Sequence, residues 1–246
     1  MKWINDMIKL VVSDFDGTLR TKGNTEPTPS VLAKIKSIID NGIFFAVSSG
    51  RLLCDLDLHF PEIASNLYFI SSDGALITKN NKIIFTSPFT HNAVSFFFNS
   101  FKGQGSVRFF SKDKTFVLGE KIAESDIPVV YPHQINESIY KIICYNMIAS
   151  GFEAFSRIHY SNSELVEFAP LLANKGVALG ALQRHLGVSL YDTLAMGDRD
   201  NDIPMMKNAK YKVSVGNRCE RIYKATDIHV SDPDEILQKV WLKSDF

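Results

Sequence analysis

The sequence predicts an α/β protein whose parallel-sheet core is interrupted by an inserted α+β domain. Short apolar runs that end in small polar residues recur in the first and last thirds of the chain, as buried parallel strands do. Segments with helical spacing of apolar residues alternate with these runs, but the alternation is lost in the middle. We therefore expect residues 1–85 and 170–246 to form the core and residues 86–169 to form the inserted cap domain.

Length and composition favour a globular protein that acts on small molecules. The 246 residues are 45% apolar, which is enough to bury a full core. Lys plus Arg equals Asp plus Glu at 27 each, so the chain lacks the basic character of a nucleic-acid-binding protein. The three cysteines have no metal-site spacing, and neither an export signal nor a membrane span is evident. We expect a cytoplasmic protein with no nucleic-acid or membrane partner, either a monomer or a homodimer.

The first third of the chain reads as alternating strands and helices. A strand at residues 8–13 precedes a helix that Thr28 caps, with Pro29 at its first position and its end at Gly42. The next strands are expected, in order, at residues 43–47, 67–70, 75–78 and 83–85, the last two joined as a hairpin by an asparagine-rich turn.

The inserted domain is predicted to mix strands with short helical pieces. Strand-like segments lie at residues 106–110, 139–145 and 164–168. The aromatic run at residues 96–98, with Phe101, fits either an apolar lid over a substrate or plain core. We favour core, because large aromatic side chains at helical spacing are usually buried.

After the insertion the alternation returns. Asp232 is expected to cap the last helix, with Glu235 three residues on as in a capping box. The elements expected before it are a helix at residues 174–185, a strand at 193–196, a helix that ends at Asn208, and strands at 211–215 and 227–230.

Two carboxylates, Asp14 and Asp16, follow the first strand, where open α/β sheets place their active sites. Aspartate, glycine and threonine are also ordinary turn formers, so the segment at residues 14–19 is ambiguous by itself. If it is catalytic, Asp14 can attack phosphorus and form an aspartyl-phosphate. Asp16 can then protonate the leaving alkoxide and later activate water.

Three later segments support phosphoryl transfer. Ser49 offers a hydroxyl and nearby backbone N–H groups, and Gly50 allows close approach of a phosphate oxygen. Lys175 opens a helix and can place a cation beside the same phosphate. The third segment, residues 197–202, follows a strand and holds three carboxylates. Acids clustered at a strand end need a cation, and Mg²⁺ fits best because it binds carboxylates together with phosphate oxygens. We assign Asp200 to the solvated start of a helix rather than to the metal.

At this point the sequence resembles the haloacid dehalogenase superfamily of phosphatases, and within it the Cof-like subfamily with a large α/β cap. Four motifs match in order and with family-like spacing. They are Asp-x-Asp-Gly-Thr-Leu at residues 14–19, Ser-Gly-Arg at 49–51, Lys-Gly at 175–176, and Gly-Asp-x-x-Asn-Asp at 197–202. The resemblance implies a Rossmann-like core with the cap inserted between the second and third motifs.

The resemblance also implies roles for individual residues. Asp14 would be nucleophile and Mg²⁺ ligand, and Asp16 would be acid and base and bind the metal through its main-chain carbonyl. Asp198 would be the third protein ligand, with Asp202 supporting the metal shell. The phosphate and substrate would contact Ser49, Gly50, Arg51, Asp73, Lys175 and Asn201.

The chain departs from the family pattern at three informative positions. Asp73 stands where the family usually has asparagine, which places a negative charge at an expected substrate contact. Ser49 replaces the commoner threonine and keeps the hydroxyl. Arg199 is bulkier and more basic than usual, which suggests either an extra anionic group on the substrate or a surface salt bridge to Asp200 or Asp202.

Three functions are compatible with these motifs. The leading hypothesis is a Mg²⁺-dependent phosphatase that acts on a small phosphorylated metabolite such as a sugar phosphate, with pyridoxal phosphate or a flavin phosphate as further candidates. A sugar phosphomutase would share the aspartyl-phosphate intermediate. A non-catalytic binding module ranks last, because Asp14, Asp16 and Asp198 are all present.

Overall fold

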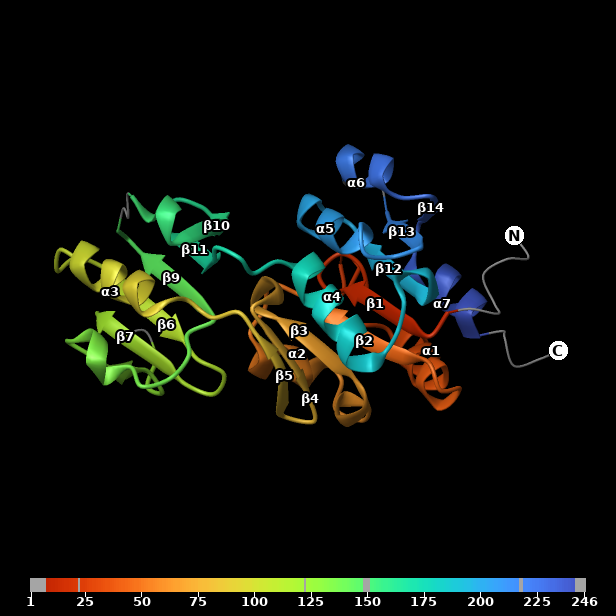
Figure 1. The fold of residues 1–246 in the computed structure, drawn as a ribbon, viewed down its shortest axis with the longest axis horizontal. Coiled ribbons are helices and arrows are strands. Elements are labelled where there is room, and N and C mark those ends of the chain that lie inside the picture. The colour runs from red at the N-terminus through yellow and green to blue at the C-terminus, as the bar shows by residue number, and fades with distance from the viewer. Residues whose placement is uncertain (1–7, 22, 122, 148–150, 217–218, 242–246) are drawn as a thin grey trace.

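The structure is a computed structural model, and it describes residues 8–21, 23–121, 123–147, 151–216 and 219–241. Its elements form two sheets that lie side by side and are joined by two chain crossings, after β5 and after β11 (Figure 1). The larger sheet has the order β14-β13-β12-β1-β2-β3-β4-β5. Its strands are β1 (Leu10–Asp14), β2 (Phe44–Ser48), β3 (Tyr68–Ser71), β4 (Leu76–Lys79), β5 (Lys82–Thr86), β12 (Thr193–Gly197), β13 (Tyr211–Val215) and β14 (Ile228–Val230).

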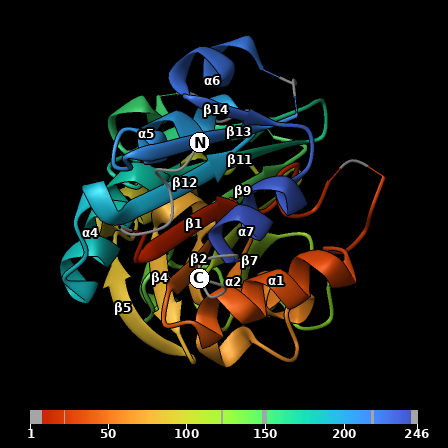
Figure 2. The same cartoon turned by 90° about the vertical axis from the view of Figure 1, so that its right-hand side faces the viewer.

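Helices cover both faces of this sheet (Figure 2). One face packs against α1 (Pro29–Asp40), α2 (Leu53–Leu56) and α7 (Pro233–Trp241). The other face packs against α4 (Lys175–Leu186), α5 (Ile203–Met206) and α6 (Glu220–Ala225). Successive side chains of a strand point to opposite faces, so Val11 joins the first core and Val12 the second. The predicted α/β core with a parallel sheet is confirmed; only β4 and β5 run antiparallel to their neighbours.

The smaller sheet is built from the middle of the chain. Its order is β10-β11-β9-β6-β7-β8, and α3 (His91–Ser100) covers one face. Its strands are β6 (Ser106–Phe110), β7 (Thr115–Gly119), β8 (Ile127–Pro128), β9 (Lys141–Tyr145), β10 (Ser156–Ser161) and β11 (Leu165–Pro170). β5 and β11 each end one residue beyond the proposed domain boundaries, so the two sheets divide close to them.

The aromatic run belongs to the core of this smaller sheet. Phe97 and Phe98 are buried between α3 and the strands, where Phe98 stacks on Phe109 of β6 at 5.0 Å between ring centroids. Phe96 and Phe101 pack against the same cluster. The preference for core over a lid is therefore confirmed.

The two helix caps predicted from the sequence are present in the structure. Thr28 caps α1, and its Oγ1 accepts a hydrogen bond from the N–H of Val31 at 3.3 Å. Before α7, Oε1 of Glu235 accepts from the N–H groups of Ser231 and Asp232, at 3.0 and 3.2 Å.

The expected helix to Asn208 was too long. The structure has a 3₁₀ turn, Asp200–Asp202, followed by the short α5 with Pro204 near its start. The side chain of Asp202 is bonded to the preceding backbone, which keeps the chain in a turn instead of a long helix. The strands β7, β8 and β10 and the helices α2 and α6 were not predicted from the sequence. In the described part of the chain, no helix combines the length and apolar character needed to cross a bilayer.

The buried Cys144 provides a chemical test of this packing. Burial raises the pKa of its thiol to about 12, so at pH 8 almost none of it is thiolate. We expect iodoacetamide at pH 8 to leave Cys144 unmodified in the native protein while the exposed Cys54 reacts. Peptide mass spectrometry, with urea-denatured protein as the reference, measures both sites. Labelling of Cys144 at the denatured rate would contradict this packing.

Candidate active site

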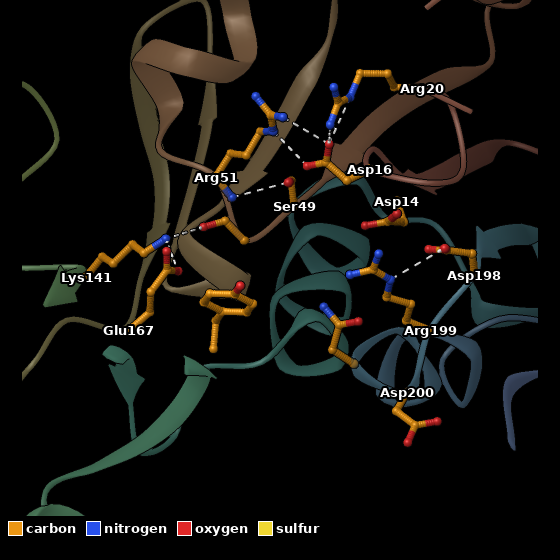
Figure 3. A pocket seen from close by; sticks show the side chains of 13 residues that line it. Asp14, Asp16, Arg20, Ser49, Arg51, Lys141, Glu167, Asp198, Arg199 and Asp200 are labelled. Atoms are coloured by element: carbon orange, nitrogen blue, oxygen red, sulfur yellow. Dashed lines mark hydrogen bonds and ion pairs between the residues drawn. The ribbon is translucent and has the colours of Figure 1, made fainter. Parts of the chain in front are cut away.

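The order of the core sheet gathers the sequence motifs at one edge. β1 lies between β12 and β2, so Asp14, the last residue of β1, has Ser48 of β2 opposite it. The segments that follow β2 and β12 supply Ser49 and Asp198. They open on a cavity of about 810 Å³ between the two sheets (Figure 3). Its lining residues are Asp14, Asp16, Arg20, Ser49, Gly50, Arg51, Lys141, Tyr160, Glu167, Asp198, Arg199, Asp200 and Asn201.

A buried lysine lies directly behind Asp14. The Nζ of Lys175, the first residue of α4, is 2.5 Å from Oδ1 of Asp14 and 2.6 Å from Oδ1 of Asp202. Burial alone would lower the pKa of Lys175, but the carboxylates of Asp14, Asp202 and Asp73 outweigh it and raise that pKa above its ordinary value. Lys175 is therefore a fixed ammonium in contact with the carboxylate at the base of the cavity.

Asp202 organises the loop after β12. Its Oδ2 accepts hydrogen bonds from the backbone N–H groups of Asp198 and Arg199, both at 3.1 Å. A Cβ at Gly197 would lie 2.6 Å from this carboxylate, so the approach requires glycine. Because both oxygens of Asp202 are occupied in this way, it holds Asp198 and Lys175 in place.

The acidic cluster fits a divalent cation. Asp14, Asp198 and Asp202 each have a carboxylate oxygen within 4.8 Å of the others, and all three residues are buried. Oδ2 of Asp14 is buried and accepts no hydrogen bond from the described residues. Burial, and then the charge of Asp202, raises the pKa of Asp14 despite the neighbouring Lys175 ammonium. Three carboxylates stand beside this one ammonium, so the cluster carries surplus negative charge when they are ionised. Hard oxygen ligands with surplus negative charge are the donor set that Mg²⁺ takes.

Two arginines hold Asp16. Its carboxylate accepts from Nε of Arg20 at 2.9 Å and from Nε and Nη2 of Arg51 at 2.7 and 3.0 Å (Figure 3). Burial acts to raise the pKa of Asp16, but the hydrogen bonds from Arg51 and Arg20 outweigh it and lower that pKa below its usual range. Asp16 is therefore ionised in this arrangement.

Ser49 uses its own backbone N–H within the core and lines the cavity. The backbone N–H of Ser49 donates to Ile70 O at 2.8 Å, so it is used within the sheet. Its hydroxyl faces the cavity side and accepts from the N–H of Arg51 at 3.2 Å. The hydroxyl remains able to donate, and the role predicted for the neighbouring backbone N–H groups stays a prediction.

Ser49, Gly50, Arg51 and Asn201 line the cavity as expected of substrate contacts, whereas Asp73 and Lys175 do not line it. The buried carboxylate of Asp73 forms an ion pair with Arg157 of β10. Arg157 also donates to Ala173 O, from Nε at 3.0 Å and from Nη2 at 2.7 Å. The ion pair of Asp73 therefore links the core to the smaller sheet. It lies next to Ala173, two residues before Lys175 in the chain.

Arg199 also differs from expectation. Its Nε lies 3.6 Å from Oδ2 of Asp198, not beside the side chain of Asp200. Asp200 instead accepts from Nη1 of Arg221 at 2.6 Å and from Sγ of Cys219 at 2.9 Å. The predicted salt bridge of Arg199 is therefore present, but its partner is Asp198 and not Asp200 or Asp202.

Four cavity residues were not found by sequence reasoning. Arg20 follows the first motif, and its spacing of four residues from Asp16 was the one available signal. Lys141, Tyr160 and Glu167 come from β9, β10 and β11 of the smaller sheet. Nothing local in the sequence indicates that these strands face the motifs.

Known proteins resemble this chain in sequence and in fold. A family model described as haloacid dehalogenase-like hydrolase matches residues 11–145 and 128–236. A phosphoglycolate phosphatase of Methanobrevibacter smithii is 23% identical over 225 residues, which cover 89% of this chain and 91% of that protein.

Solved structures share the fold. A crystal structure of a Thermotoga maritima protein superposes with a TM-score of 0.81 at 19% identity, covering 95% of this chain and 97% of that one. A sugar phosphatase described as haloacid dehalogenase subclass IIB superposes with a TM-score of 0.71 at 18% identity, covering 93% and 95%.

The Asp73–Arg157 pair gives a prediction on stability. In a double-mutant cycle of Asp73→Asn and Arg157→Met, we expect a coupling free energy of about 1–2 kcal/mol, because a charged hydrogen bond is lost and Arg157 is partly exposed. Urea unfolding of the four proteins measures it. Additive losses in the two single variants would show that the pair contributes nothing of its own.

Proposed function

We propose that this chain, which belongs to the haloacid dehalogenase-like hydrolase family, is a Mg²⁺-dependent phosphatase that works through an aspartyl-phosphate. The observation that carries the proposal is the position of Asp14. It ends β1 at the base of the cavity, in contact with the Lys175 ammonium and within the acidic cluster. A carboxylate so placed can meet a phosphate group that enters from the cavity.

In the first step a carboxylate oxygen of Asp14 attacks phosphorus. The bond between phosphorus and the leaving-group oxygen breaks, and Asp16 gives that oxygen a proton. Since Arg20 and Arg51 keep Asp16 ionised, Asp16 must turn away from them and take up a proton before this step. The products are the free alcohol and phosphorylated Asp14.

In the second step water attacks the phosphorus of the acyl phosphate, and ionised Asp16 accepts the proton of that water. The bond between phosphorus and the Asp14 oxygen breaks, which restores the carboxylate and leaves inorganic phosphate. The Lys175 ammonium and the Ser49 hydroxyl hold phosphate oxygens through both steps. Asn201, which lines the cavity, contributes a further polar contact.

Mg²⁺ would be held by Asp14 and Asp198, with the main-chain carbonyl of Asp16 as a third ligand and Asp202 supporting the set. When bound, it would offset the surplus negative charge and stabilise charge on the transferring phosphoryl group. A cavity of about 810 Å³ suits a small phosphorylated metabolite. A sugar phosphate is the class we favour; the names of two relatives, a phosphoglycolate phosphatase and a sugar phosphatase, give a precedent for substrates of this size.

The decisive experiment is phosphate release from a panel of phosphorylated metabolites, with Mg²⁺ and with excess EDTA. We expect release by wild type with Mg²⁺ only, and none by Asp14→Asn, because an amide is a poor nucleophile of nearly the same shape. Circular dichroism provides the check that the variant is folded. Turnover by folded Asp14→Asn would exclude the covalent mechanism, and phosphoryl movement between sugar hydroxyls without phosphate release would indicate a mutase.

Asp16→Asn tests the acid and base role. We expect kcat on an alkyl phosphate to fall by about 10²–10⁴-fold. The fall should be smaller in single-turnover phosphorylation by p-nitrophenyl phosphate, whose leaving group needs no proton. Rapid-quench measurement of the two leaving alcohols makes the comparison. Equal losses for both substrates would show that Asp16 does not act as the acid in the first step.

A further inference from the structure

The smaller sheet contributes a charged pair to the wall of the active-site cavity. In β9 and β11 the side chains of Ile142, Cys144 and Phe168 point toward α3, so the alternating positions of Lys141 and Glu167 face the other way. That other face borders the cavity, and both residues line it. Figure 3 shows the two side chains together, across the cavity from Arg199.

The pair is fixed in place by a contact with the core. Nζ of Lys141 forms an ion pair with Oε2 of Glu167 and donates to the carbonyl oxygen of Gly50 at 3.2 Å. Gly50 lies between Ser49 and Arg51, at the side of the cavity where we place the phosphate. The Lys141 and Glu167 side chains are only 11% and 20% exposed, so their charges act on a ligand through little water.

The Lys141–Glu167 pair carries no net charge. Each cationic side chain in the cavity lining has a carboxylate partner, although Arg20 and Arg51 share Asp16, and Arg199 is mostly exposed at 3.6 Å from Asp198. A second anionic group of a substrate, placed at the Lys141–Glu167 pair, would have to displace Glu167 from Lys141 and would meet the negative charge of Glu167. An uncharged group that carries hydroxyls can bind without breaking the pair, since Glu167 accepts a hydrogen bond from one hydroxyl and Lys141 donates one to another.

We propose that Lys141 and Glu167 determine substrate specificity, by selecting phosphomonoesters whose leaving group is uncharged and carries hydroxyl groups. This inference rests on the proposed phosphatase function and narrows its substrate class. Its physical basis is that polar groups which stay paired discriminate strongly against a ligand that would leave one of them unpaired.

The test compares two substrates that share a skeleton. Glycerol 3-phosphate and 3-phosphoglycerate differ in one position, where a hydroxymethyl group is replaced by a carboxylate. We expect wild type to have a higher kcat/KM for glycerol 3-phosphate. In Glu167→Gln the ratio of the two kcat/KM values should fall about tenfold, because the repelling charge is lost and Lys141 can then accept a carboxylate.

The reverse change is expected for Lys141→Met. There Glu167 keeps its charge without its partner, so the ratio should rise further in favour of glycerol 3-phosphate. Because each ratio compares two substrates of the same variant, a general loss of activity cancels out of it. Opposite shifts from the two variants are a readout that general damage to the fold would not produce.

A second ion pair in the inserted domain provides a matched control. Lys114 and Glu137 also form an ion pair there, but neither lines the cavity. Glu137→Gln makes the same chemical change as Glu167→Gln, and we expect it to leave the substrate ratio unchanged.

Two results would overturn this inference and leave the proposed phosphatase function intact: a wild-type preference for 3-phosphoglycerate, or a ratio in Glu167→Gln equal to that in Glu137→Gln. Either result has this meaning only when wild type hydrolyses p-nitrophenyl phosphate. Failure of wild type to release phosphate from all three compounds would instead remove the proposed function, and this inference with it.

Discussion

The part of the core that carries the candidate active site depends on the buried ammonium of Lys175. A charge so deeply buried is stable only when it is paired, and here Asp14 and Asp202 supply the partners. These three residues come from the start of α4, the end of β1 and the turn after β12. Their contact therefore fixes three separate elements relative to one another, and it places Asp14 at the base of the cavity.

The same constraint reaches the smaller sheet. Ala173, two residues before Lys175, accepts from Arg157 of β10, and Arg157 also pairs with Asp73 of the core. In the cavity wall, Lys141 of β9 donates to the carbonyl oxygen of Gly50. Charged side chains thus hold the smaller sheet against the core at two separate places. A change in the position of the smaller sheet would therefore displace Ala173 and Gly50, which lie next to Lys175 and Ser49 in the chain.

Sequence reasoning succeeded where the signal is local. Strand ends, the Thr28 cap and the carboxylates of the motifs follow from neighbouring residues, and the sheet order then brings Asp14, Ser49 and Asp198 together. It could not find contacts made across the fold. Asp73 is 84 residues from Arg157, and Gly50 is 91 residues from Lys141. No periodicity or spacing in one sequence links such positions, so the ion pair of Asp73 with Arg157 could not be predicted.

The charges around the cavity explain how such a site can be both folded and ready for a ligand. Carboxylates gathered at a strand end would repel one another if they stood alone, yet Asp16 has two guanidinium partners and Asp14 has Lys175. A phosphate group and a cation that enter the cavity therefore exchange partners with groups that are already paired and oriented. Because these groups are ordered in advance, binding does not have to order them, and this lowers the entropic cost of binding. Charge pairing thus stabilises the fold at the positions where we propose that the chemistry takes place.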